Sequence, residues 1–416
     1  MDSSPSGFAN VTASPEWLYH AASPKNQHQM SQDQVFVDDW NDELEQEAVS
    51  SEKSLVVFSR DWTVETIASQ IERGNIDLNP KFQRRNAWND TRRSKLIESL
   101  LLGVPVPEIV LAEDKSRKNS FIVIDGKQRL LAIAGFIKPE KGIWDAPALR
   151  GLKSRADLNG RKFSDFFNGE SEKQEATDLL NSDIRCTVIS NYSSSKVLYD
   201  IFYRLNTGSV PLSSQELRQV LNAGEFADYL IEKTNAKIPL HSVLRLDGPD
   251  ARLRDAELLL RFVSLRLFGS KYDGNLMPFL DGNMLEINKA WTEYESKVDK
   301  LYQAFNTATE FLLATFPPGK VGRKYTSDKW ETRFNRALFE VQVYYFSRVS
   351  PAQLEALDKP LVISTFQNFC NSDGEFQASI ETSTKTIQNY ETRFTKFQQV
   401  MNAALGLHVD DIPVQA

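Results

Sequence analysis

The segment Asp125 to Arg129 is the part of the sequence best suited to bind a phosphate group. It reads Asp-Gly-Lys-Gln-Arg, follows the apolar run 121–124 and precedes a helical pattern. The first amide groups of a helix have no partner within the helix, and the helix dipole favours an anion there. Gly126 permits a close backbone approach, and the Arg129 guanidinium can contact two oxygens. The alternative is an ordinary turn between a strand and a helix.

A second candidate segment lies upstream. Asn79 to Trp88 is a polar, extended run just before a helical pattern, and it contains Gln83 and Arg84. Residues 81–95 hold six basic residues and one acidic residue, which is a dense positive patch in an otherwise acidic chain. Arginines at the start of a helix favour a nucleotide phosphate or a nucleic-acid backbone. The alternative is a solvated surface.

A third segment combines a helix end, a glycine turn and a new helix start. Arg204 and Asn206 precede Gly208, and Ser213 to Glu216 has the pattern of a capping box. The side chains of Arg204 and Asn206 could donate hydrogen bonds to a phosphate. The alternative is that they only cap the end of the preceding helix.

The elements that must position these segments are those of an α/β or mixed α+β domain at 55–236. Short strand-like runs alternate with amphipathic helical patterns there. The residues 138–174 read as surface loops with a short hairpin. We expect strands at 108–112, 120–124 and 184–190, and helices at 63–74, 89–102, 126–136, 193–205 and from about Gln215.

The flanking regions differ in composition. Residues 1–54 are polar and acidic and predict a disordered tail. Residues 237–416 show apolar positions at helical spacing and predict an all-helical domain. Its expected helices are 252–268, 284–316, 330–349 and 382–405, with a basic loop at 317–328 that contains Lys320, Arg323 and Lys324.

The composition excludes several classes of protein. The net charge of -7 argues against coating nucleic acid by bulk charge. Two cysteines cannot build a disulfide framework or a cysteine zinc site, which favours a reducing cytoplasm. The four histidines have neither metal-ligand spacing nor an obvious carboxylate neighbour. The sequence contains no run of about 18 apolar residues, so it predicts no membrane span.

Taken in order, the motifs resemble the GmrSD-type restriction endonuclease N-terminal domain. The resemblance covers roughly 60–225, with a weaker echo at 254–262, and rests on Asn79–Trp88, Leu102–Pro107, Asp125–Arg129 and Arg204–Ser213. That family is similar to the ParB and sulfiredoxin superfamily, in which a Gly-x-x-Arg loop holds nucleotide phosphates. The resemblance implies a ParB/sulfiredoxin-like domain followed by a helical C-terminal domain.

The resemblance also implies roles for individual residues. Gly126 and Arg129 would contact the phosphates of an NTP, and Asp125 and Gln128 would order the loop or take part in hydrolysis. Mg²⁺ would bridge the phosphates to Asp125 or to another carboxylate. Lys127 stands where the family most often has Gln, which adds positive charge but bears on hydrolysis if that glutamine positions water. The residues expected near the nucleotide are Gln83, Arg84, Arg204 and Asn206.

The family often joins this domain to a His-Asn-His nuclease domain, which needs a histidine base and metal ligands. His241 and His408 stand alone in the sequence, so we expect any nuclease to be a separate subunit. The first hypothesis is an NTP-binding and NTP-hydrolysing module of a restriction or phage-defence system. The second is a nucleotide-gated DNA-binding protein without turnover, which would use 81–95 and the 317–328 loop. The third is a regulatory or scaffolding subunit.

Overall fold

The computed structural model describes residues 55–78, 88–115, 117–139, 144, 147–193, 197–198, 201, 213–381, 384 and 386–409. Its larger sheet has five strands in the order β1-β5-β3-β4-β2. The strands are β1 (Val56–Thr63), β2 (Ile76–Asp77), β3 (Ile109–Glu113), β4 (Phe121–Asp125) and β5 (Asp183–Ser190). β1 pairs antiparallel with β5, β5 parallel with β3, β3 antiparallel with β4, and β4 parallel with β2. The sheet is therefore mixed, as the expected fold class requires.

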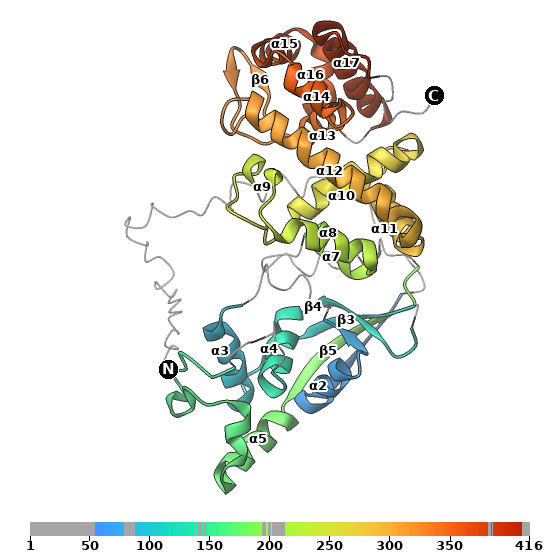
Figure 1. Ribbon diagram of the computed structural model, residues 1–416. Coiled ribbons are helices and arrows are strands. Elements are labelled where there is room, and N and C mark those ends of the chain that lie inside the picture. Colours follow the sequence, from blue (N-terminus) through green and yellow to red (C-terminus); the bar gives the residue numbers. More distant parts are fainter. Residues whose placement is uncertain are drawn as a thin grey trace, which may run out of the picture. The chain divides into compact units, whose positions relative to one another are not determined.

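The side chains of the central strands alternate between two apolar cores. Ile109 and Leu111 of β3 enter one core, and Val110 and Ala112 enter the other, because successive residues of a strand face opposite sides of a sheet. The first core also holds apolar residues of α2 (Val64–Glu72), α3 (Asp90–Leu101), α4 (Lys127–Ile137) and α5 (Glu170–Asn181). Figure 1 shows these helices beside the sheet. Burial on both faces explains why these strands read as continuous Val and Ile runs.

The second core includes Ile124 of β4 and Leu217 of α7 (Ser214–Leu221). Ser213 caps α7: its hydroxyl accepts from the amide of Glu216, and the Glu216 carboxylate accepts from the amide of Ser213 at 2.6 Å. The predicted capping box is confirmed. It fixes the start of the helix that packs against β4.

Most of the predicted strands and helices of this region are confirmed within one or two residues, and the predicted helix at 193–205 lies mostly outside the described residues. β1 was not predicted, and the described residues within 138–174 contain no strand of the hairpin that was expected there. The described residues there form the 3-10 helices η2 (Ala156–Leu158) and η3 (Phe163–Phe167), and α5 begins at Glu170. The apolar residues Trp144 and Phe166 are buried against the core, which pulls this segment onto the domain.

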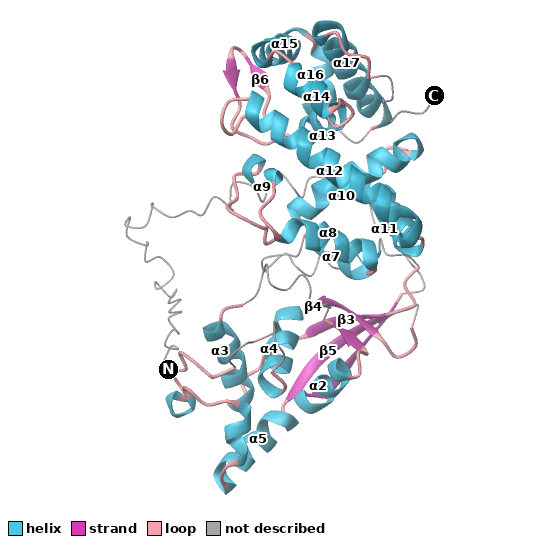
Figure 2. Cartoon of the chain, in the orientation of Figure 1, coloured by secondary structure: helices cyan, strands magenta, loops and turns pink. Residues whose placement is uncertain are grey.

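Beyond Asn222 the described chain is mostly helical, as Figure 2 shows. The predicted helix at 284–316 is two helices, because the chain turns at Ala290 between them. The predicted loop at 317–328 contains half of a small hairpin, β6 (Tyr325–Thr326) and β7 (Lys329–Trp330). The helices are α8 (Glu225–Asn235), α9 (Pro239–Val243), α10 (Arg254–Phe268), α11 (Leu276–Lys289), α12 (Trp291–Thr315), α13 (Arg336–Phe346), α14 (Pro351–Ala356), α15 (Lys359–Ser372), α16 (Gly374–Glu381) and α17 (Ile387–Leu405).

α10 is the central helix of this part of the chain, since 12 of its 15 residues are buried. Eight of these twelve residues are apolar, and the buried Arg261 forms ion pairs with Glu257 and Glu340. None of the described helices combines the length and the apolar character needed to cross a membrane.

Candidate phosphate-binding loop

The loop between β4 and α4 has a backbone that only glycine adopts readily. Gly126 precedes the first residue of α4 with φ = 96°, and no side chain caps the helix start. A Cβ atom at this position would lie 2.9 Å from Cγ1 of Ile109 and 3.1 Å from Nη2 of Arg129. The glycine is therefore required both by its φ and by the close packing of β3. A shift in the β3–β4 register between Val110 and Leu111 lies directly opposite Asp125.

The Arg129 side chain is fixed against the loop by two hydrogen bonds. Its Nη2 donates to the Asp125 carboxylate at 2.7 Å and to the backbone carbonyl of Glu108 at 2.9 Å. Only 13% of the Arg129 side chain is exposed, against 38% for Asp125. The Nε group of Arg129 is buried and has no hydrogen-bond partner among the residues that the structure describes. The guanidinium is thus oriented by two contacts and retains donor capacity.

Gln128 joins this loop to the start of α3. Its Oε1 accepts a hydrogen bond from the amide of Trp88 at 3.0 Å, although the two residues are 40 positions apart. Asn89 follows and caps α3 by accepting from the amide of Arg92 at 2.9 Å. The segment 125–129 therefore lies beside the end of the segment 79–88. This is one of the contacts that a convergent site requires.

Lys127 approaches the third segment instead. Burial lowers the pKa of its ammonium to about 8, while the carboxylates of Glu216 and Asp77 act in the opposite direction. Glu216 is itself buried, which raises its pKa, whereas the amide of Ser213 and the charges of Arg252 and Lys127 favour its ionised form. The positive charge of Lys127 therefore interacts with two carboxylates of the protein.

Four of the residues expected near the nucleotide, Gln83, Arg84, Arg204 and Asn206, lie outside the described residues, and their convergence with Arg129 stays a prediction. Sequence reasoning missed the carbonyl of Glu108 and the proximity of Glu216 to Lys127. No sequence signal marks the first, because any residue supplies a carbonyl. The capping box did indicate that Glu216 is held in place, but not what it faces.

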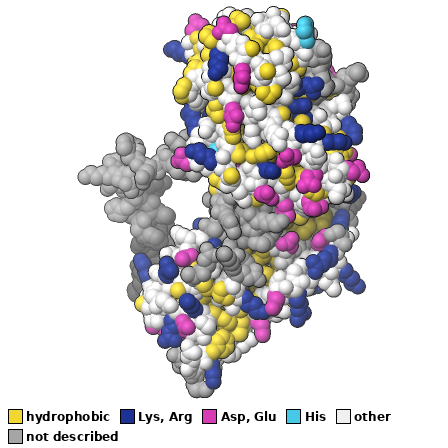
Figure 3. Space-filling view, viewed as in Figure 1, with side chains coloured by type: hydrophobic (Ala, Val, Ile, Leu, Met, Phe, Trp, Pro, Cys, Tyr) yellow, Lys and Arg dark blue, Asp and Glu magenta, His cyan; other side chains and the backbone are white. Residues whose placement is uncertain are grey.

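The basic segments are less exposed than the sequence predicted. Among the basic residues in the described part of 81–95, Arg93 is buried, and Arg92 and Lys95 are exposed. On the face that Figure 3 shows, basic and acidic side chains are interspersed. A uniform basic surface is therefore not visible on that face.

The prediction of a basic loop for DNA at 317–328 is wrong for two of its three cations. Arg323 is fully buried. Lys324 forms ion pairs with Glu331 and Glu381. Neither cation is therefore an exposed, unpaired charge of the kind that the sequence predicted for this loop.

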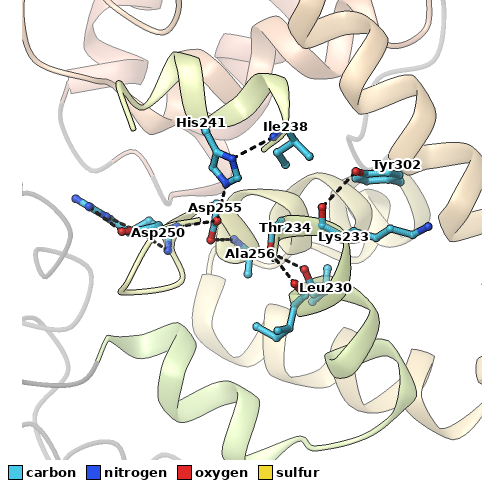
Figure 4. Close-up of polar contacts among 11 residues, drawn as sticks. Leu230, Lys233, Thr234, Ile238, His241, Asp250, Asp255, Ala256 and Tyr302 are labelled. Atoms are coloured by element: carbon cyan, nitrogen blue, oxygen red, sulfur yellow. Dashed lines mark hydrogen bonds and ion pairs between the residues drawn. The ribbon is translucent and has the colours of Figure 1, made fainter. Parts of the chain in front are cut away.

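His241 does have a carboxylate neighbour, contrary to the expectation from the sequence. Its Nδ1 accepts from the amide of Ile238 at 3.1 Å, and its Nε2 lies 2.8 Å from the carboxylate of Asp255 (Figure 4). Because Nδ1 accepts, Nε2 carries the proton and donates to Asp255. That carboxylate also accepts from the amides of Asp250 and Ala256. The pair is fully buried and joins α9 to α10.

Comparison with known proteins adds one finding. Residues 64–222 match the sequence model of the family described as "GmrSD restriction endonuclease, N-terminal domain". The match contains the whole loop from Asp125 to Arg129 and ends just after α7. A comparison with curated proteins found no match.

Proposed function

We propose that the chain binds and hydrolyses nucleoside triphosphates, because residues 64–222 match the family described as "GmrSD restriction endonuclease, N-terminal domain". The domain marks the chain as a component of a restriction or phage-defence system. The observation that carries the nucleotide-binding part of the proposal is the geometry of the loop between β4 and α4. An uncapped helix start, a left-handed glycine and an oriented arginine occur together there.

The loop offers a phosphate three kinds of stabilisation. The first amides of α4 have no partner within the helix, and no acidic residue occupies its first turn. Gly126 leaves the backbone open to close approach. Arg129 supplies a charge whose position is already fixed, so little side-chain entropy is lost when a ligand binds. Backbone amides and a preoriented guanidinium are also the groups that stabilise charge in phosphoryl transfer.

A divalent cation fits this loop only in partnership with the nucleotide. No group of three or more His, Cys, Asp or Glu side chains suited to a metal occurs in the described part of the chain. Asp125 is the half-exposed carboxylate at the loop. Mg²⁺ is commonly held by one or two carboxylates together with substrate phosphates, so Asp125 is the residue that would hold it. The ion would supply charge neutralisation between Asp125 and the phosphates.

Arg129→Ala is the direct test. We expect calorimetric titration of the wild-type chain with ATP and GTP in Mg²⁺ to detect binding by at least one of them, and Arg129→Ala to weaken it by about tenfold or more, the worth of a charge-assisted contact. Arg73→Ala removes an exposed arginine at the end of α2 and should leave affinity unchanged. Equal affinity of wild type and Arg129→Ala for every nucleotide would refute the proposal.

Hydrolysis is tested separately from binding. Lys127→Gln introduces the residue most common in the family at this position. If that glutamine positions the attacking water, phosphate release should rise in Lys127→Gln while nucleotide affinity changes little. If wild type and Lys127→Gln both bind nucleotide but release no phosphate, the chain binds without turnover.

The second candidate, a nucleotide-gated DNA-binding protein without turnover, is favoured by one contact. The hydrogen bond from Trp88 to Gln128 places exposed Arg92, whose guanidinium lies 4.6 Å from the centre of the Trp88 ring, next to the nucleotide loop. A nucleotide in the loop could thereby alter a basic segment. DNA affinity measured with and without nucleotide, together with phosphate release, separates the two functions.

For cleavage of DNA we propose a separate nuclease subunit. His241 is buried and bonded to Asp255, so it cannot reach a DNA phosphate as a general base. Co-purification of a nuclease activity with the full chain, and its absence from the isolated chain, would support this division of labour.

A further inference from the structure

Arg323, in the segment that joins α12 to β6, is a fully buried cation without a carboxylate partner. Its Nη1 donates to the carbonyls of Val243 at 2.8 Å and Val321 at 2.6 Å, and its guanidinium lies 5.0 Å from the centre of the Phe334 ring. Its Nε and Nη2 groups are buried and donate to no acceptor in the described part of the chain. Charged donors that are buried without acceptors destabilise a fold, so an acceptor is expected there.

The positive charge of another cation, Arg245, acts on Arg323. Burial and the positive charge of Arg245 lower the pKa of Arg323 to about 10. Arg245 is exposed and has φ = 60°, a left-handed conformation that an arginine rarely adopts. Its Nη2 donates to the carbonyl of Gly319 at 3.0 Å. A Cβ on Gly319 would come within 3.1 Å of this guanidinium, so the glycine makes room for it.

Lys320 is a further basic residue of the segment that holds Arg323. It follows Gly319, and its carbonyl accepts from the amide of Arg323 at 3.2 Å. Across the described ranges, no carboxylate lies within ion-pair distance of Arg245, Lys320 or Arg323. The neighbouring Lys324 is different, since it pairs with Glu331 and Glu381. The acids of this region therefore neutralise Lys324 and leave the other three cations uncompensated.

We propose that Arg245, Lys320 and Arg323 form a binding site for a phosphate group, separate from the loop at 125–129. A guanidinium group can donate two hydrogen bonds to a pair of phosphate oxygens. The charge of three cations also suits the multiple negative charge of a phosphate better than the single charge of a carboxylate. Arg245 and Lys320 supply the outer donors, and Nε and Nη2 of Arg323 supply the inner ones. Because those two nitrogens are covered, a surface side chain must move first, and Arg245 is the exposed member with one hydrogen bond to release.

The phosphate can come from two sources, free inorganic phosphate or the backbone of a nucleic acid. The contacts that carry the proposal serve either source, because both present the same oxygens. A basic pair at the surface with a third cation beneath it would bind without reading sequence. The experiment below separates the two sources.

The first measurement is thermal unfolding of the full chain with increasing inorganic phosphate, in chloride buffer at constant ionic strength. It is carried out in the Arg129→Ala background so that the 125–129 loop does not contribute. We expect phosphate to raise the midpoint, because a ligand that binds only the folded state stabilises it. The double variant Arg245→Ala/Lys320→Ala should weaken phosphate binding by about tenfold or more, whereas Arg73→Ala should not.

Arg323→Met distinguishes a ligand site from a purely structural arginine. If Arg323 is a buried charge that awaits an anion, the apolar replacement should unfold at the same or a higher temperature without phosphate and should lose the phosphate-dependent rise. If its contacts to Val243 and Val321 are its whole role, Arg323→Met should be destabilised equally with and without phosphate. That second outcome, or a wild-type midpoint that ignores phosphate, overturns the proposal.

Fluorescence anisotropy with a labelled duplex of about 20 base pairs, titrated at several salt concentrations, identifies the source. If the site takes a nucleic-acid backbone, Arg245→Ala/Lys320→Ala should reduce the slope of log affinity against log salt by about two, one for each lost contact. If the slope is unchanged while the response to inorganic phosphate is lost, the site takes free phosphate.

Discussion

Gly126→Ala tests the central structural argument, because the effect of the added methyl group can be worked out from the structure. Two separate penalties are expected. The backbone at Gly126 has φ = 96°, which is unfavourable for an L-residue by about 1–2 kcal/mol. The new Cβ would also lie 2.9 Å from Ile109 and 3.1 Å from Nη2 of Arg129. Overpacking of this kind destabilises by about 1–3 kcal/mol.

The chain offers a matched control for the first penalty. Gly160 has φ = 89°, and a Cβ there would meet no atom within 4 Å. Gly160→Ala should therefore show only the backbone penalty of about 1–2 kcal/mol. The reduced freedom of the unfolded chain is common to both variants and cancels in the comparison. Gly126→Ala is thus expected to be the less stable variant by about 1–3 kcal/mol, the overlap alone.

Urea unfolding of both variants, followed by tryptophan fluorescence, measures the difference, and nucleotide titration measures the consequence for the loop. Gly126→Ala should weaken nucleotide binding because it displaces the Arg129 guanidinium, whereas Gly160→Ala should not. If the two variants lose the same stability, the close packing of Ile109 on the loop is refuted. If they differ in stability but not in nucleotide affinity, the loop is rigid but does not hold the phosphates.

Two further predictions concern buried ionisable groups. The pKa of Lys127 is lowered to about 8 in the folded state, so between about pH 8 and 10.5 the unfolded chain binds more protons, and wild-type stability should rise with pH there relative to Lys127→Gln. Thermal unfolding of both chains from pH 7 to 10 checks this; a constant difference would refute the buried position of the ammonium. His241→Ala removes the hydrogen-bond partner of the Ile238 amide and one of the hydrogen bonds to the Asp255 carboxylate, and it should destabilise the fold by about 1–3 kcal/mol. His408→Ala is the exposed control, and equal midpoints in urea unfolding would show that the His241–Asp255 contact contributes nothing.

Local sequence determined much of the fold. The Val- and Ile-rich runs became β3, β4 and β5, and Ser213 and Glu216 formed their capping box, because strand preference and helix capping depend on neighbouring residues. β1 was missed because its residues are largely exposed and lack a clear apolar alternation. The break at Ala290 was missed because apolar residues continue at helical spacing on both sides of it.

Some residues of the candidate site could also be predicted from local sequence, and others could not. Asp125, Gly126 and Arg129 could be predicted because a strand, a glycine and a helix start are consecutive in the chain. The sequence could not predict three features of the structure: the hydrogen bond between Gln128 and Trp88, the interaction of Lys127 with Glu216, and the burial of Arg323. The first two features join residues that are 40 or more positions apart. The burial of Arg323 depends on which face of its loop packs against the protein. Side-chain charge and capping chemistry are properties of the sequence itself, whereas exposure and ion pairing arise only when distant segments pack, and it was packing that decided which arginines remain available to a ligand.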